Sequence, residues 1–495
     1  MRRAVPIVLC LLVVAAAPAS PPAQSKRSAA LTAALASTPA GGRLTAWVFF
    51  TDKGGAGRAS AGQGASLLTP RARSRRALRG RVAALTSDDL PLSASYVDAV
   101  AAAVSRVRQR SRWLNAVSVE ATPAQLQAIE ALPFVARLDV VRRYRRREEE
   151  PLRAEEPPAR SAVSGPRRRP HSPLALDYGS SLGQLAQLGV PDVHAMGLHG
   201  DGVVIAVFDS GFNSLNHEVF SSLRIVAAHD FVNGDDDVGD GSDLGEGSHG
   251  TETLSVLAGF QDGQLIGPAF ASDVILAKTE NTASETPVEE DNWAAAAEWA
   301  ESLGADVIST SLGYLDYDSP FPSYGFADMD GRTAISTRAA EMAAARGVVV
   351  VASAGNSGFD AGHNTLGAPA DGARVLAIGA VTSSGARASF SSVGPSTDGR
   401  IKPDFAAQGV NVKVALPGTV SRYGTASGTS FSCPLAAGVV ALLLQLNPTA
   451  SVDDVAGVLR ATASQAGRPD NLLGWGIVDA RAAALGWTPA LPAAR

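Results

Sequence analysis

Three polar residues stand at points where the sequence changes from one kind of segment to another. Asp209 directly follows the apolar run 203–208. His249 opens an apolar stretch, and Ser430 comes at the end of a run of small residues. Serine is a weak nucleophile unless a base takes its proton, and a histidine base needs a carboxylate to fix its tautomer. The three residue types together therefore provide the groups for acyl transfer.

The positions of these residues suit that chemistry. A carboxylate that directly follows six apolar residues is costly to bury without hydrogen-bond partners, so Asp209 needs donors at the end of its strand. His249 is predicted to lie at a helix N-terminus. Ser430 ends a small-residue loop that starts at Gly424 and leads into an apolar helix over 431–446. Backbone N–H groups at the start of such a helix can bind a developing oxyanion.

The elements that must position these groups follow from the hydrophobic pattern. Continuous apolar runs predict strands that are buried on both faces of a parallel sheet. These runs cover 203–208, 274–277, 307–309, 348–352 and 375–381. Helices are predicted over 286–304 and 332–346, and the all-apolar helix over 431–446 should be central. We therefore expect a doubly wound α/β fold with a mostly parallel sheet, whose sites form at the carboxyl ends of the strands.

Charge divides the chain into two unlike parts. The whole chain carries −5, but residues 1–175 carry +16 and residues 176–495 carry −21. Opposite fields would hold the two parts together. An apolar fraction of 45% excludes wholesale disorder, and the two cysteines, Cys10 and Cys433, are too few for a disulfide scaffold or a cysteine-rich zinc site.

The region before the α/β domain is expected to have three segments. Residues 1–19 have the two arginines, the apolar run and the A-x-A pattern of a signal peptide. Residues 20–141 are expected to form a small α+β domain, with strands over 45–50, 114–120 and 135–141 and helices over 88–108 and 122–132. Residues 142–175 are rich in arginine, glutamate and proline, which predicts an exposed linker and a processing site. Residues 176–495 complete the chain as the α/β domain.

The three polar motifs resemble those of the subtilisin-like serine proteases. They are Asp209-Ser210-Gly211, His249-Gly250-Thr251 and the run Gly428-Thr429-Ser430-Phe431-Ser432-Cys433-Pro434. The order Asp, His, Ser is that of subtilisin. The resemblance covers about 178–484, including a closing segment over 474–480. It implies that Asp209 orients the base, that His249 is the general base and acid, and that Ser430 is the nucleophile.

Two further segments fit the same resemblance. In the family, the asparagine of a Gly-Asn motif after a strand donates to the oxyanion, which implies this role for Asn356. The segment after the strand 307–309 resembles a backbone rail that pairs with an extended peptide substrate. The substrate-binding residues expected from the resemblance are Ser311, Leu312, Gly313, Ser353, Ala354 and Gly355.

The resemblance implies a secreted serine endopeptidase, extracellular or periplasmic, that is made as a zymogen. Its N-terminal domain would be a propeptide that assists folding, inhibits in cis and is then cleaved off. The expected partners are protein or peptide substrates and the chain's own propeptide, with no nucleic acid and no membrane span, and we expect a monomer. No cofactor is expected to be required and no metal ligand is predicted. Family members often bind structural calcium, for which the sequence assigns no ligand.

Two other functions remain open from the residues alone. The chain could be a catalytically silent binding protein with the same fold, although the intact set of Asp209, His249, Asn356 and Ser430 argues against it. Residues 179–183 also fit the G-x-S-x-G pattern of α/β-hydrolase esterases, with Ser181 as nucleophile. That motif needs a buried strand before it, which the preceding residues do not provide.

Two features are better read as structural. The acidic stretch 233–240 does not fit a calcium-binding EF-hand loop, since the glycine position holds Asp240. Cys433, one helical turn after Ser430, is interpreted as a small buried side chain rather than a catalytic thiol. His217, His229 and His363 have no metal-ligand spacing and are expected to be structural.

Overall fold

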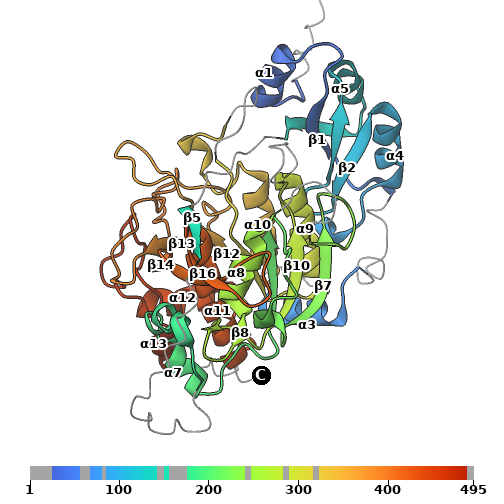
Figure 1. The fold of residues 1–495 in the computed structure, drawn as a ribbon. Coiled ribbons are helices and arrows are strands. Elements are labelled where there is room, and N and C mark those ends of the chain that lie inside the picture. The colour runs from blue at the N-terminus through green and yellow to red at the C-terminus, as the bar shows by residue number, and fades with distance from the viewer. Residues whose placement is uncertain are drawn as a thin grey trace, which may run out of the picture.

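The protein is a small N-terminal domain seated on a larger α/β domain (Figure 1). The structure, a computed structural model, describes residues 25–55, 67–80, 85–141, 150–154, 176–239, 247–281, 289–315 and 323–487. The predicted signal peptide, 1–19, and most of the predicted linker, 142–175, lie outside the described residues.

The α/β domain is built on a seven-stranded sheet with the order β14-β13-β12-β11-β6-β10-β7. Every neighbouring pair of strands is parallel, which confirms the predicted fold class. The strands are β6 (Val204–Asp209), β7 (Arg224–Asp230), β10 (Asp273–Lys278), β11 (Val307–Thr310), β12 (Val349–Ser353), β13 (Leu376–Val381) and β14 (Phe405–Gln408). All five apolar runs identified in the sequence are strands of this sheet.

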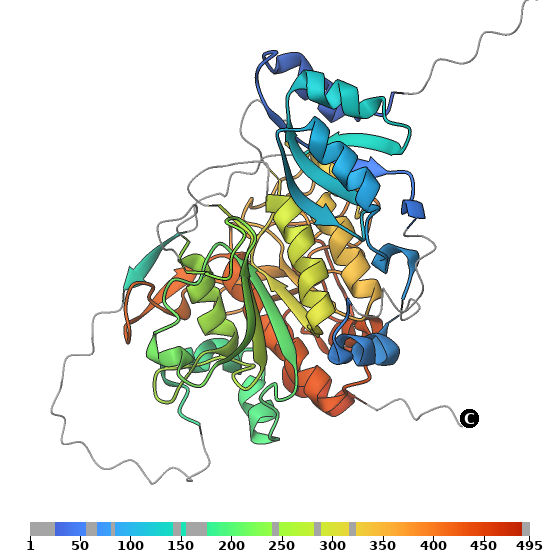
Figure 2. The same ribbon diagram turned by 90° about the vertical axis from the view of Figure 1, so that its right-hand side faces the viewer.

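Helices cover both faces of the sheet (Figure 2). On one face lie α9 (Glu289–Leu303) and α10 (Ile335–Ala345), and on the other lie α8 (His249–Ala258) and α11 (Thr429–Leu446). The alternation of side chains divides each strand between two cores. In β6, Ala206 and Phe208 pack in the core with α9 and α10, whereas Ile205 and Val207 pack in the core with α8 and α11.

Shorter elements complete this domain. They are α6 (Leu182–Ala186), α7 (Val190–Ala195), α12 (Val452–Thr462), α13 (Ala480–Gly486), β8 (Phe260–Gln261), β9 (Leu265–Ile266), β15 (Val412–Ala415) and β16 (Tyr423–Ser427). Among the described residues, α11 is the helix whose length and composition would suit a membrane span, but 89% of its apolar window is buried inside the protein. It is the core helix that the sequence predicts.

The N-terminal domain is an antiparallel sheet with helices on one face. Its strand order is β2-β3-β1-β4, and α4 and α5 contact the sheet. Its elements are α1 (Ala29–Ser37), β1 (Leu44–Phe50), α3 (Pro70–Arg79), α4 (Ala94–Ala103), β2 (Arg106–Ser111), β3 (Ala116–Ala121), α5 (Pro123–Glu130) and β4 (Val135–Val140). The prediction of one helix over 88–108 is wrong at both ends, because the helix α4 covers only Ala94–Ala103 and 106–111 is a strand that pairs with β3. Cross-strand pairing here overrides the local pattern.

Two predictions about irregular segments also need correction. The loop expected from Gly424 is the strand β16, which pairs with β15. Part of the expected exposed linker, Glu150–Ala154, is the strand β5, which pairs antiparallel with the other edge of β16. An unpaired strand edge offers a row of backbone hydrogen-bonding groups, so a polar segment can add to it without an apolar pattern of its own.

The other face of the N-terminal sheet lies on α9 and α10. All seven residues of β1 are buried, which a strand facing water on one side would not allow. Trp47 is 1% exposed, and the guanidinium of Arg338 on α10 lies 5.4 Å from the ring of Phe49. Glu298 on α9 accepts hydrogen bonds from the backbone N–H groups of Arg112 and Trp113, at 3.1 and 3.2 Å.

A second carboxylate of α9, Asp291, is also buried beneath the N-terminal sheet. Burial raises its pKa to about 8, and Glu290 adds to this effect. Ser118, Arg108 and Trp47 of the N-terminal domain lower the pKa but do not outweigh burial. Asp291 therefore takes up a proton when the N-terminal domain covers it, because an exposed aspartate has a pKa of about 3.9.

This proton uptake predicts a pH-dependent attachment of the N-terminal domain. The contribution of Asp291 to attachment should be complete below about pH 4 and should fall by up to about tenfold per pH unit as the pH rises towards 8. Asp291→Asn should lower by about one the number of protons that are taken up on attachment, which flattens the pH dependence. The measurement is the urea concentration at which the N-terminal domain detaches, followed between pH 5 and 9 in the full chain. An unchanged slope in Asp291→Asn would show that Asp291 does not titrate in the interface.

Candidate active site

Asp209 ends β6, the strand that lies between β11 and β10 in the sheet. Its side chain is fully buried. The Oδ1 atom accepts the backbone N–H of Ser210 at 2.8 Å and lies 2.6 Å from Nδ1 of His249, while Oδ2 accepts the hydroxyl of Thr253 at 2.9 Å. These donors compensate the carboxylate for the loss of water, as the sequence requires of a charge in this position.

His249 is the first residue of α8, as predicted. Thr253 follows it by one helical turn, so both side chains face Asp209 from the same side of the helix. Gly250 allows this close approach, since a Cβ atom there would lie 2.4 Å from the carbonyl oxygen of Gly211. None of the sequence motifs marks Thr253, although its i+4 spacing from His249 on a predicted helix is a signal for a residue that faces Asp209.

Ser430 is the second residue of α11 and follows both Asp209 and His249 in the chain. The ring of Phe431, the next residue, contacts the ring of His249 edge-on at 5.6 Å between centroids. The Oγ atom of Ser430 donates to the carbonyl of Ser311 at 3.2 Å, and Oγ of Ser311 donates to the carbonyl of Ser430 at 2.8 Å. The end of β11 and the start of α11 are therefore fixed to each other.

Asn356 is fixed by the residue that precedes Ser430. Its Oδ1 atom accepts from both the backbone N–H and the hydroxyl of Thr429, each at 2.9 Å. The Thr429 hydroxyl also accepts the backbone N–H of Gly355 at 3.3 Å. Because the oxygen of the amide faces Thr429, its Nδ2 end faces the other way. The carboxamide is thus oriented from the start of α11.

The six residues expected to bind substrate lie at the ends of two adjacent strands, β11 and β12. Ser353 donates its hydroxyl to the carbonyl of Leu312 at 3.3 Å, which joins the two segments. The side chains of Ser311, Leu312, Ser353 and Ala354 are buried. Gly313 and Gly355 are partly exposed. A substrate would therefore meet the backbone of these segments rather than long side chains.

The two other candidate nucleophiles have structural positions. Burial raises the pKa of the Cys433 thiol to about 12, so it is not ionised at neutral pH, and its Sγ atom lies 3.4 Å from the carbonyl of Thr310. Ser181 is fully buried in a short 3₁₀ helix, where its hydroxyl donates to the carbonyl of Tyr178 and accepts the N–H of Ile266. Neither position suits a reactive group.

The described residues contain no group of three or more His, Cys, Asp or Glu side chains that could hold a metal ion. In the acidic stretch, carboxylates of Asp235 and Asp237 accept backbone N–H groups of their own turn, at 2.9 and 3.0 Å. His229 contacts Asp236 at 2.8 Å. The described part of this stretch therefore caps a turn and does not gather its oxygens around one point.

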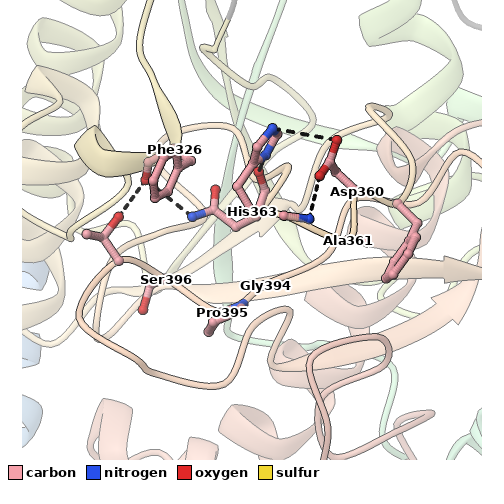
Figure 3. A pocket seen from close by; sticks show the side chains of 11 residues that line it. Phe326, Asp360, Ala361, His363, Gly394, Pro395 and Ser396 are labelled. Carbon is pink, nitrogen blue, oxygen red and sulfur yellow. Dashed lines mark hydrogen bonds and ion pairs between the residues drawn. The ribbon is translucent and has the colours of Figure 1, made fainter.

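A surface hollow is lined by residues 359–364, which follow Asn356 in the chain, together with Phe326 and residues 394–397 (Figure 3). It has a volume of about 350 Å³, and its wall includes Phe326 and His363, whose rings stack at 5.6 Å. Asn364 donates to the carbonyl of Phe326 at 3.2 Å, and Asp360 accepts the N–H of Gly362 at 2.7 Å. None of the residues predicted to act in catalysis or substrate binding lines this hollow.

Comparison with protein families matches two parts of the chain. Residues 200–476 match the subtilase family, peptidase S8. Residues 45–155 match the peptidase S8 propeptide domain of Bacteroidota. The first match covers the seven-stranded sheet with the buried carboxylate, the histidine and the serine. The second covers the N-terminal domain from β1 onward and continues through β5.

Known proteins and structures agree with these matches. Subtilisin NAT of Bacillus subtilis subsp. natto is 32% identical over 315 residues, which are 63% of this chain and 73% of the relative. Subtilisin Savinase of Lederbergia lenta is 33% identical over 300 residues, 60% of this chain and 97% of the relative. The fold is similar to fervidolysin of Fervidobacterium pennivorans, with a TM-score of 0.62 and 22% identity, over 90% of this chain and 61% of that one.

The Thr253 hydroxyl should affect the reactivity of Ser430, because it donates to the carboxylate of Asp209. Thr253→Val keeps the shape of the side chain but leaves Asp209 without one donor, which should slow the reaction of Ser430 with a fluorophosphonate about tenfold in the processed protein. Thr253→Ser retains the hydroxyl and should react at the unsubstituted rate. Equal rates for Thr253→Val and Thr253→Ser would show that the hydroxyl does not matter for the site.

Proposed function

Because the chain belongs to the subtilase family, we propose that it is a secreted serine endopeptidase that cleaves peptide bonds through Asp209, His249 and Ser430 and is made as a zymogen. One observation carries this proposal above the others. His249 lies 2.6 Å from a fully buried carboxylate, at the sheet edge where Ser430 begins the central helix. A buried Asp–His pair beside a serine is the arrangement that activates a hydroxyl.

In the proposed reaction, Ser430 Oγ attacks the carbonyl carbon of the peptide bond while Nε2 of His249 takes the hydroxyl proton. The tetrahedral intermediate collapses as the C–N bond breaks, and His249 returns the proton to the leaving amine. This leaves the acyl group as an ester on Ser430. A water molecule then repeats the sequence, giving its proton to His249 and releasing the carboxylic acid and the serine.

Two groups support this sequence. Asp209 accepts the Nδ1–H of His249, which leaves Nε2 as the base and stabilises the imidazolium that forms. Asn356, held through its oxygen by Thr429, would donate from Nδ2 to the negatively charged oxygen of the intermediate, together with backbone N–H groups at the start of α11. Both donors are positioned before the substrate arrives, so they cost no reorganisation during the reaction.

The substrate would bind as an extended strand along 311–313 and 353–355. The partly exposed glycines at the ends of these segments offer backbone groups for β-augmentation. The region 176–495 carries −21, which would favour the approach of basic polypeptides at low salt. This field acts on approach and not on the choice of the bond that is cut.

The zymogen part of the proposal is supported by the N-terminal domain and by β5. The matched propeptide domain covers α9 and α10 with its sheet. In the antiparallel pairing of β5 with β16, Glu150 stands opposite Ser427, three residues before Ser430. We propose that the enzyme cuts its own linker between Arg142 and Leu176, and that residues 1–19 direct its export.

A catalytically silent binding protein remains the alternative from another class. No observation on the described residues favours it, since Asp209, His249 and Asn356 are all held in position by hydrogen bonds. The esterase alternative at Ser181 has the further difficulty that its hydroxyl is buried.

The first test removes the nucleophile. Ser430→Ala should abolish peptide hydrolysis and leave the full chain uncut, whereas the unsubstituted chain should yield a mature N-terminus between Arg142 and Leu176. The measurements are hydrolysis of a protein substrate and N-terminal sequencing. Ser181→Ala is the matched control and should process normally. Activity that persists in Ser430→Ala but disappears in Ser181→Ala would favour the esterase-type site instead.

The second test addresses the carboxamide. Asn356→Ala should lower kcat by about 10²–10³ and change KM little, because the donor acts on the oxyanion and not on the bound substrate. Steady-state kinetics on a peptide substrate with the processed enzyme measure both constants, and the melting temperature verifies that the variant is folded. A folded variant in which KM rises and kcat is unchanged would place Asn356 in substrate binding.

A further inference from the structure

The arginine-rich helix α3 belongs to the N-terminal domain in sequence but lies apart from that domain's sheet in space. Figure 2 shows it at the far end of α9 and α10 from the N-terminal sheet. Its first turn is anchored there by Thr69, whose N–H and hydroxyl donate to the carbonyls of Ser302 and Leu303, both at 2.9 Å. The sequence shows only a basic stretch at this position, which would ordinarily predict a solvated helix.

Two arginines of α3 enclose Glu301 of α9. Arg76 donates from Nε and Nη2 to the two oxygens of Glu301 at 2.7 and 2.6 Å. Arg75 forms an ion pair with the same carboxylate and donates to the carbonyl of Ala305 at 2.5 Å. The Arg76 and Glu301 side chains are both 0% exposed. Removing one partner of such a buried pair leaves an uncompensated charge.

Two further arginines of α3 meet Asp306 at the amino end of β11. Arg79 donates to Asp306 at 2.9 Å and to the carbonyl of Pro448 at 2.7 Å, and Arg71 forms an ion pair with Asp306. Asp306 also accepts the N–H of Val204 at 2.9 Å. The contact therefore reaches the amino ends of both β11 and β6.

The contact of α3 with Asp306 lies at the amino ends of the strands, whereas the proposed catalytic residues lie at their carboxyl ends. Asp306 precedes β11, whereas Ser311, which bonds to Ser430, follows it. Two glycines of the α/β domain allow α3 to approach closely, because they have no Cβ atom. A Cβ atom at Gly304 would lie 2.7 Å from the Arg71 side chain, and one at Gly347 would lie 2.9 Å from Cβ of Arg79.

A third carboxylate, Asp89, ties the helix to both domains. Asp89 of the N-terminal domain accepts from Arg76 at 2.9 and 3.0 Å and from Arg346, at the end of α10, at 3.2 Å. The guanidinium of Arg346 also lies 4.5 Å from the ring of Trp113. The buried charges thus form one network, in which arginines of both domains share the carboxylates.

We propose that Glu301 and Asp306 form a docking site for an arginine-bearing helix, that α3 of the same chain occupies it, and that it anchors the N-terminal domain independently of the active site. The site binds two pairs of arginines that lie on one face of a helix. A segment that is only basic in composition does not meet this requirement. One consequence rests on the proposed zymogen function: the N-terminal domain stays bound at this site after the linker is cut.

Amide hydrogen exchange of residues 70–80 tests the site in the full chain carrying Ser430→Ala. Exchange should be slow, and Arg76→Ala and Glu301→Gln should each accelerate it by at least about tenfold. The double variant should exchange no faster than the faster single variant, since the two substitutions remove the same contact. Arg73→Ala removes an exposed arginine that donates to the carbonyl of Leu68 at 2.8 Å, just before the helix, and should accelerate exchange far less than Arg76→Ala.

The proposal is overturned if residues 70–80 of the chain with an unsubstituted α3 exchange as fast as exposed segments. It is also overturned if Arg76→Ala accelerates their exchange no more than Arg73→Ala does. Should Arg76→Ala not fold, Arg76→Lys keeps the charge but loses the two-pronged contact and must accelerate exchange relative to Arg73→Lys. Exchange needs no catalysis, so an inactive enzyme would overturn the proposed function and leave this result standing. In an active enzyme, Arg76→Ala should also shorten the delay before full activity, and size-exclusion chromatography should find its cut N-terminal fragment detached.

Discussion

A carboxylate is buried in a protein only where donors or cations replace the water that it loses, and this constraint shapes both halves of the molecule. In the candidate active site, Asp209 is compensated by a backbone N–H, a hydroxyl and His249. In the interface with the N-terminal domain, Glu301 and Asp306 are compensated by arginines of α3, and Glu298 by backbone N–H groups. The donors come from the same domain in the first case and from the N-terminal domain in the second.

That difference gives the two sets of carboxylates different roles. Asp209 keeps its partners when the N-terminal domain leaves, so the active site is complete within the α/β domain. Glu301 and Asp306 lose their arginines, and Asp291 loses the cover that keeps it protonated, so all three become exposed charges on a domain that already has a large negative excess. The charge difference between 1–175 and 176–495 is therefore more than a long-range attraction, because part of it is neutralised in close, buried contacts at a defined place.

The sequence predicts the central sheet, and the strand and helix ends at which Asp209, His249 and Ser430 stand, because each depends on a local pattern. The apolar runs are long enough to be buried on both faces, and Asp209, His249 and Ser430 stand next to them. The missed elements depend on distant partners. The strand β2 forms because β3 offers an edge, β5 because β16 does, and the arginines of α3 are buried because Glu301 and Asp306 lie beneath them. Local composition instead suggests a helix continuing into β2 and solvated segments for β5 and α3.

The central claim is that Ser430 carries the acyl group in a hydrolytic reaction supported by His249 and Asp209. The most direct measurement is peptide mapping by mass spectrometry after the processed enzyme has been mixed with an acylating ester that it turns over slowly and then quenched in acid. The account predicts the acyl group on the peptide that contains Ser430, in a yield close to one per molecule. An acyl group on Ser181 or Cys433, or steady turnover without any acylated serine, would contradict it.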